Sequence, residues 1–173
     1  MPKNKTIANQ PSPGWSIPPS WIQDHNGTRT DLAQAGELSI LEAAEHALEL
    51  ARQHQAFLDK SHIPLITHQT WMDMDAQTWS YLIRERVERW LSVAIQPKDE
   101  PLKGPEMAWF LWDDNGIDAL IRRYEPDLYE DFQRLPYPVE KADVFRVVVL
   151  KWFGGIVSIV RQHYSSVHHL TQV

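Results

Sequence analysis

The sequence predicts an α/β domain, because short apolar strands alternate with amphipathic helices along most of its length. One strand is expected at residues 62–71 and another at 109–112, and a segment with helical spacing follows each of them. A third apolar segment ends at Gly154 and Gly155. The 173 residues are enough for one domain with its own core.

Residues 1–36 are expected to form a mostly disordered leader, because Pro, Asn, Gln, Ser and Gly dominate there without sustained periodicity. A helix is expected at 37–60, where apolar residues such as Leu38, Leu41 and Leu48 recur every three or four positions. This helix either packs on the domain or forms a short coiled-coil neck.

The strand at 62–71 contains Pro64 near its start, a position that a strand tolerates. Helical spacing returns at 75–95, and a linker with three prolines follows at 96–106. The strand at 109–112 leads into a turn at 113–116 that also supplies a helix cap. Two further helices are expected at 117–124 and 128–135, with Pro126 between them.

The valine-rich segment at 139–152 fits either a strand or a buried helix. Its three consecutive valines favour a strand, whereas the spacing of its apolar residues also fits a buried helix. It contains Asp143 and Arg146, which a helix would place on one face. Such charges in an apolar segment pair with each other or hold a polar ligand. Gly154 and Gly155 allow a tight turn from a helix into a strand.

The composition excludes several classes of protein. A net charge of −6 argues against a nucleic-acid partner, and the absence of cysteine excludes disulfides and thiolate chemistry. No apolar segment reaches the ~18 residues that span a bilayer, so the sequence predicts a soluble chain with no membrane span. No acidic residue follows Asp143.

Three sequence blocks occur in the order typical of one enzyme family. Residues 63–71, IPLITHQTW, resemble an opening strand IPKIIHQTW, and residues 110–114, FLWDD, are similar to an LWDD strand end. Residues 135–156 resemble a segment that reads P-x-x-x-RAD-x-x-R followed by YGGIY. Together the blocks resemble the fungal DXD-motif glycosyltransferases of family 32, of the mannosyltransferase and mannosyl inositol phosphorylceramide synthase type.

The resemblance implies a partial GT-A fold, Rossmann-like, at residues 61–156. It implies transfer of a hexose, expected to be mannose from GDP-mannose, to a glycan or sphingolipid acceptor at the Golgi or another secretory membrane. His68 and Trp71 would bind the nucleotide, and Asp143 and Arg146 the donor sugar. The alternative for His68 is a hydrogen-bonded structural histidine, and for Trp71 a core or rim position. The alternative for Asp143 and Arg146 is an ion pair on a helix surface.

The chain departs from the family after Ile156. The family continues with Tyr and the Asp-x-Asp pair that binds Mn²⁺ or Mg²⁺, whereas residues 156–161 read IVSIVR. The sequence therefore predicts truncation before the DXD motif, no metal ligands and little or no activity. Residues 157–173 are interpreted as a divergent, non-native tail, which a translated intron would explain. The alternative function is a non-catalytic pseudo-transferase, a weak nucleotide-binding or interaction module.

Overall fold

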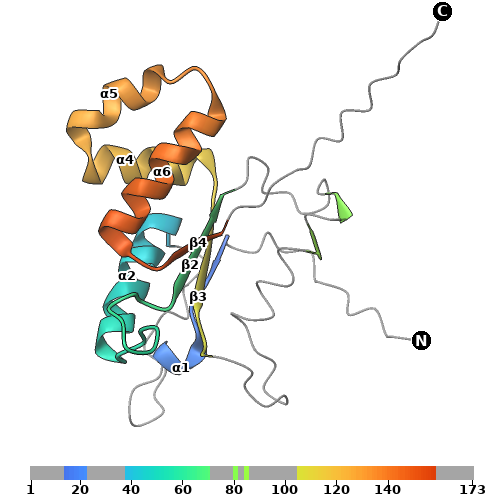
Figure 1. Cartoon of the computed structure of the whole chain (residues 1–173), viewed down its shortest axis with the longest axis vertical. Helices are drawn as coiled ribbons and strands as arrows, with labels where there is room; N and C mark the ends of the chain where they lie inside the picture. Colours follow the sequence, from blue (N-terminus) through green and yellow to red (C-terminus); the bar gives the residue numbers. More distant parts are fainter. Residues whose placement is uncertain (1–13, 23–37, 71–79, 82–83, 86–104, 159–173) are drawn as a thin grey trace, which may run out of the picture.

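The computed structural model describes residues 14–22, 38–70, 80–81, 84–85 and 105–158 (Figure 1). Within these residues one mixed sheet carries helices on one of its faces, which confirms the predicted α/β class. The elements are β1 (Trp15–Ser16), α1 (Pro19–Ile22), α2 (Ile40–Gln53), β2 (Ile66–Thr70), β3 (Ala108–Trp112), α4 (Asp114–Tyr124), α5 (Pro126–Arg134), α6 (Pro138–Phe153) and β4 (Ile156–Ser158). The helix predicted at 75–95 and the linker at 96–106 lie almost entirely outside the described residues.

The sheet has four strands in the order β1-β3-β2-β4. β2 runs parallel to both β3 and β4, and β1 pairs antiparallel with β3. Thr67 of β2 lies opposite Trp109 on one side and Ile156 on the other. Because three strands are parallel, their carboxyl ends meet at one edge of the sheet.

The prediction of a disordered leader is wrong for residues 14–22. β1 pairs with the edge of β3, and α1 follows it directly. Trp15, Ile17 and Trp21 are all buried, so this short segment joins the core. The order here depends on pairing with a strand about 95 residues away, which leaves no local periodicity in the sequence.

Helix α2 confirms the helix predicted at 37–60 but is shorter. It begins with a capping box in which Ser39 and Glu42 each satisfy the backbone N–H of the other. It ends at Gln53, and Gln55 soon after has a φ of 52° that a helix cannot continue. Its buried stripe consists mainly of alanines, so the helix packs on the domain.

The turn at 113–116 caps α4 as predicted. Gly116 donates its backbone N–H to Asp113 Oδ1 over 2.8 Å. Pro126 does more than separate two helices, because it occupies the first turn of α5, where a proline needs no N–H partner.

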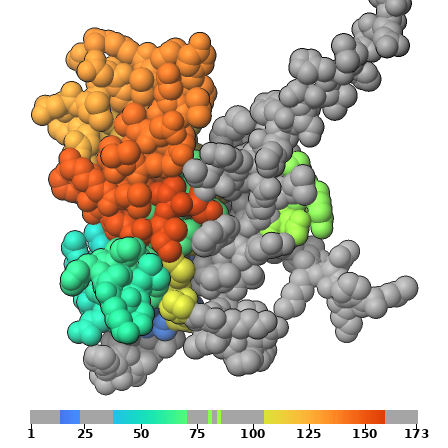
Figure 2. Space-filling model, in the orientation of Figure 1, coloured from blue at the N-terminus to red at the C-terminus, as the bar shows by residue number. Residues whose placement is uncertain are grey.

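The valine-rich segment forms helix α6. Phe145, Val148, Val149 and Phe153 are buried at helical spacing, which outweighs the strand preference of consecutive valines. The outer side of α6 lies at the molecular surface (Figure 2). Gly154 and Gly155, with φ of 66° and 84°, then turn the chain into β4, as predicted.

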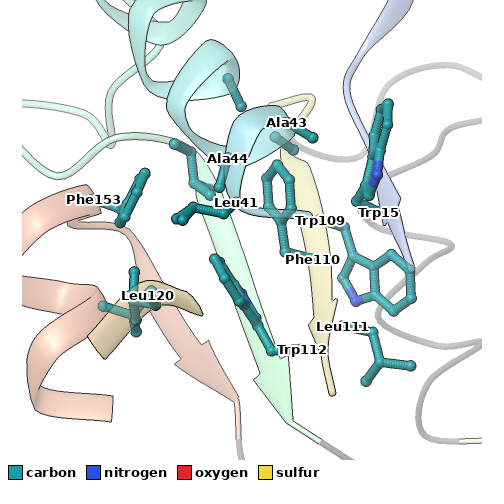
Figure 3. Packing of buried hydrophobic residues seen from close by; sticks show 14 of the residues in the cluster. Trp15, Leu41, Ala43, Ala44, Trp109, Phe110, Leu111, Trp112, Leu120 and Phe153 are labelled. Carbon is teal, nitrogen blue, oxygen red and sulfur yellow. The ribbon is translucent and has the colours of Figure 1, made fainter. Parts of the chain in front are cut away.

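The core lies between the sheet and the helices. Figure 3 shows Phe110 and Trp112 of β3 directed toward the helices and Trp109 and Leu111 directed to the other side. This alternation is the ordinary period of a strand. All four side chains are at most 6% exposed, so both faces of β3 are buried.

Candidate functional site

The strand order places a candidate binding site at one edge of the sheet. β2 comes first among the parallel strands but lies between β3 and β4, so the order of the strands reverses around it. In doubly wound sheets, ligands bind outside the carboxyl ends of the strands at such a reversal. The last residues of β2 and β4, Thr70 and Ser158, mark this position, which we call the switch edge.

His68 lies two residues before the end of β2, and its side chain is fully buried. Its ring stacks on Phe110 with centroids 5.9 Å apart, and Phe153 of α6 lies edge-on at 6.4 Å. Trp112 donates from Nε1 to His68 Nδ1 over 3.2 Å. Because an indole N–H can only donate, Nδ1 is unprotonated and the ring proton is on Nε2.

Burial lowers the pKa of His68 from 6.5 to about 3, and the Gly154 backbone opposes this shift. His68 is therefore neutral at physiological pH. A side chain with no exposed surface cannot touch a nucleotide unless the core around it moves. This geometry favours the alternative of a hydrogen-bonded structural histidine, which joins β2 to β3 and to the end of α6.

Helix α6 is held over the sheet by aromatic contacts. Phe145 packs on Trp112, the last residue of β3, with ring centroids 5.4 Å apart. Because α6 leads directly into the parallel strand β4, its amino-terminal half lies toward the carboxyl ends of the strands. The turn of α6 that carries Phe145 also carries Asp143 and Arg146, so these charges lie toward the switch edge.

Asp143 and Arg146 form an ion pair through Oδ1 and Nη2. Arg146 also donates from Nε to the Ala142 carbonyl over 3.1 Å, which restricts its guanidinium. The Arg146 side chain is 27% exposed and that of Asp143 is 63% exposed. The predicted pair therefore exists, and both groups remain within reach of a ligand; a helix-surface ion pair has the same contacts.

The remaining predicted positions have different outcomes. Trp71 directly follows β2 but lies outside the described residues. Asp113 caps α4 and Asp114 is in its first turn, as expected of turn and cap residues.

The described end of β4 has no ligands suited to a divalent cation. β4 ends in Ile156, Val157 and Ser158, none of which has a carboxylate. Nowhere in the described part of the chain do three His, Asp or Glu side chains come together as metal ligands would. Among the described helices, none has the length and apolar character that a bilayer span requires.

Gln69 is a buried polar residue to which the sequence assigns no role. It is 0% exposed, and its Oε1 accepts a hydrogen bond from Trp109 Nε1 over 2.8 Å. A glutamine in a strand that is expected to lie in the core is a usable signal, because a buried amide needs partners. In the sequence, however, Gln69 is one residue of the longer motif at 63–71, and nothing distinguishes it from its neighbours there.

Two fungal enzymes are similar to this chain. Mannosyl phosphorylinositol ceramide synthase CSH1 of Saccharomyces cerevisiae is 30% identical over 94 residues, which is 54% of this chain and 22% of that protein. Inositol phosphoceramide mannosyltransferase 3 of Schizosaccharomyces pombe is 29% identical over 104 residues, 60% of this chain and 26% of that protein. The matched region thus spans about a quarter of the length of these relatives. No family model and no solved structure matches the chain.

Proposed function

We propose that the chain is the nucleotide-binding part of a GT-A mannosyltransferase, because slightly more than half of its length is similar to two fungal enzymes that mannosylate inositol phosphoceramide. The proposed donor is GDP-mannose and the proposed acceptor is a sphingolipid head group or a glycan. The observation that supports this most is the Asp143–Arg146 pair, which α6 carries toward the switch edge. By the same relationship we propose the Golgi or another secretory membrane as its location.

The two charged groups have complementary chemistry for a hexose. The Asp143 carboxylate accepts hydrogen bonds from sugar hydroxyls, and the Arg146 guanidinium donates to hydroxyl or phosphate oxygens. The bond from Arg146 to the Ala142 carbonyl reduces the entropy that the arginine loses when it binds. The pair would thus orient the mannose of the donor, while the nucleotide lies at the ends of β2 and β4.

Mutation of Arg146 tests the proposal. Arg146→Ala is expected to weaken GDP-mannose binding about tenfold to a hundredfold, because hydrogen bonds to charged groups contribute about 1.5–3 kcal/mol. Binding of GDP itself should stay unchanged. Isothermal titration calorimetry with both ligands measures the two affinities on the same protein.

Arg134→Ala is the matched control. Arg134 pairs with Asp131 three residues earlier on α5, the spacing of the Arg146 pair, and should affect neither ligand. Equal loss of GDP and GDP-mannose in the Arg146 variant would contradict a sugar contact. Absence of nucleotide binding by the unmodified chain would contradict the proposed function.

The end of β4 favours a second candidate function, a non-catalytic module that binds nucleotide without transfer. The family's cation stabilises the leaving diphosphate by several kcal/mol, and Ile156, Val157 and Ser158 of β4 have no carboxylate to hold it. With Mn²⁺, GDP-mannose and inositol phosphoceramide, the 173-residue chain is therefore expected to transfer little or no mannose. Metal-dependent turnover by the purified chain would contradict this.

A further inference from the structure

We propose that the outer face of helix α6 binds a second copy of this chain, as an antiparallel pair of α6 helices related by a two-fold axis. The occupant is a second copy because the face is complementary to itself, both in its charges and in its apolar side chains. The inference goes beyond the proposed function and stands without it, because neither a nucleotide nor a sugar takes part in the contact.

Exposed apolar side chains gather on α6. Among the described residues, eight large apolar side chains are exposed, and four of them belong to this helix: Val139, Val147, Leu150 and Trp152. Trp152 packs against Tyr124 of α4, whereas the other three are 63%, 69% and 41% exposed on the outer side. The inner side of α6 is also apolar and lies in the core. A helix with apolar residues on both sides is ordinarily covered on both, and such an exposed face is typical of an interaction surface.

The residues of this outer face have the spacing of a coiled-coil seam. Val139, Asp143, Arg146 and Leu150 follow one another at intervals of four, three and four residues. These are the intervals between the a and d positions of a heptad, which form one stripe along a helix. The stripe has an apolar residue at each end and the ion pair in its middle. It therefore has both the apolar contacts and the charges that a helix pair can use.

Antiparallel packing gives every residue of the stripe a suitable partner. A two-fold axis at the middle of the stripe places Val139 opposite Leu150 of the second copy. The same axis places Asp143 opposite Arg146 of the second copy, because both pairs of residues are centred on the same point of the helix. The axis also repeats each contact on its other side, as an isologous interface requires.

A parallel pair of helices would bring like charges together. Each residue would then face its own copy, so that Asp143 meets Asp143 and Arg146 meets Arg146, which is unfavourable. The antiparallel pair instead joins two ion pairs into a group of four alternating charges. Arg146 has five N–H donors and uses two of them within its own chain, on the Ala142 carbonyl and on Asp143, so donors remain for the second copy.

The contact is small, so the dimer is expected to be weak. One helix against one helix buries less than the ~800 Å² per partner of a standard interface, and the dissociation constant is expected in the micromolar range or above. The contact covers Asp143 and Arg146, so a chain within the dimer cannot hold a sugar with this pair. A dimer that GDP-mannose binding leaves intact would contradict the proposed sugar contact and would leave the dimer itself standing.

Exchange of the two charges tests the dimer and its register on the full chain. Sedimentation equilibrium of the unmodified protein is expected to show a reversible monomer–dimer equilibrium between about 1 and 300 μM. Asp143→Arg and Arg146→Asp each place like charges opposite each other, so each variant alone should associate at least tenfold more weakly. An equimolar mixture of the two variants should form the dimer again, because every contact then joins a positive group to a negative one.

Leu150→Lys tests the apolar end of the stripe and should also prevent association, because it removes the partner of Val139. Leu128→Lys on α5 is the matched control, since Leu128 is similarly exposed at 37%, and it should associate normally. Circular dichroism verifies that each variant is folded. A monomer at every concentration would overturn the inference and leave the face to another protein or to a membrane surface. Dimers that survive both single charge changes, or a mixture that stays monomeric, would also overturn it.

Discussion

Replacing Gly155 with alanine is expected to lower the melting temperature by about 6–12 °C, the shift for a loss of roughly 3 kcal/mol in a domain of this size. Gly155 has a φ of 84°, which strains any residue with a side chain. An alanine Cβ there would lie 2.3 Å from the Ile66 carbonyl oxygen, and a backbone atom cannot move aside easily. A thermal melt followed by circular dichroism measures the effect.

Gly116→Ala is the control for the same chemical change. Its Cβ would meet the Cγ2 atom of Ile40 at 2.6 Å, the end of a side chain that can shift. Gly116 is also inside α4, where alanine is favoured over glycine by about 1 kcal/mol. We expect this variant to melt close to the unmodified protein. An unchanged melt for Gly155→Ala would mean that β4 does not lie along β2 as described.

Acidification from pH 7 to pH 5 is expected to lower the free energy of unfolding by about 2 kcal/mol through His68 alone. Its pKa is about 3 in the folded protein and 6.5 in an unfolded chain, so below pH 6.5 the unfolded state binds the extra proton. The stability from neutral His68 is therefore complete above pH 6.5 and falls as the pH decreases toward 3. Urea titrations at pH 7 and pH 5 measure the difference.

His68→Asn should remove this pH dependence, because the Asn oxygen can still accept from Trp112 but cannot titrate. The variant loses stability at both pH values, and only the difference between them is compared. If His68→Asn retains the full loss between pH 7 and pH 5, the neutral histidine in the core is contradicted.

The sequence predicted the local features of the fold well. The cap at Asp113, the turn at Gly154 and Gly155, and the strand that became β3 each depend on a few adjacent residues. The sequence did not decide between a strand and a helix at 139–152, because strand preference and helical spacing conflict there. Burial of Phe145 and Phe153 against Trp112 decides for the helix, and that contact is tertiary.

The leader and the site were harder to predict for the same physical reason. β1 forms because it pairs with β3, and no local sequence pattern indicates that partner. The role of His68 depends on which face of β2 the helices cover. The sequence alone therefore could not decide between a nucleotide contact and a structural role for this histidine. The hydrogen bond between Gln69 and Trp109 joins two strands that are far apart in the sequence, so the sequence alone did not predict it.

The most direct test of the proposed site is to map backbone amide signals by nuclear magnetic resonance during a GDP titration. Binding at the switch edge predicts the largest shifts at Gln69, Thr70, Val157 and Ser158, with little change in α5. An alternative site among the described residues is a cavity of about 400 Å³ at the amino ends of α2 and α4. Shifts concentrated around that cavity, or no shifts at saturating GDP, would contradict a nucleotide site at the ends of β2 and β4.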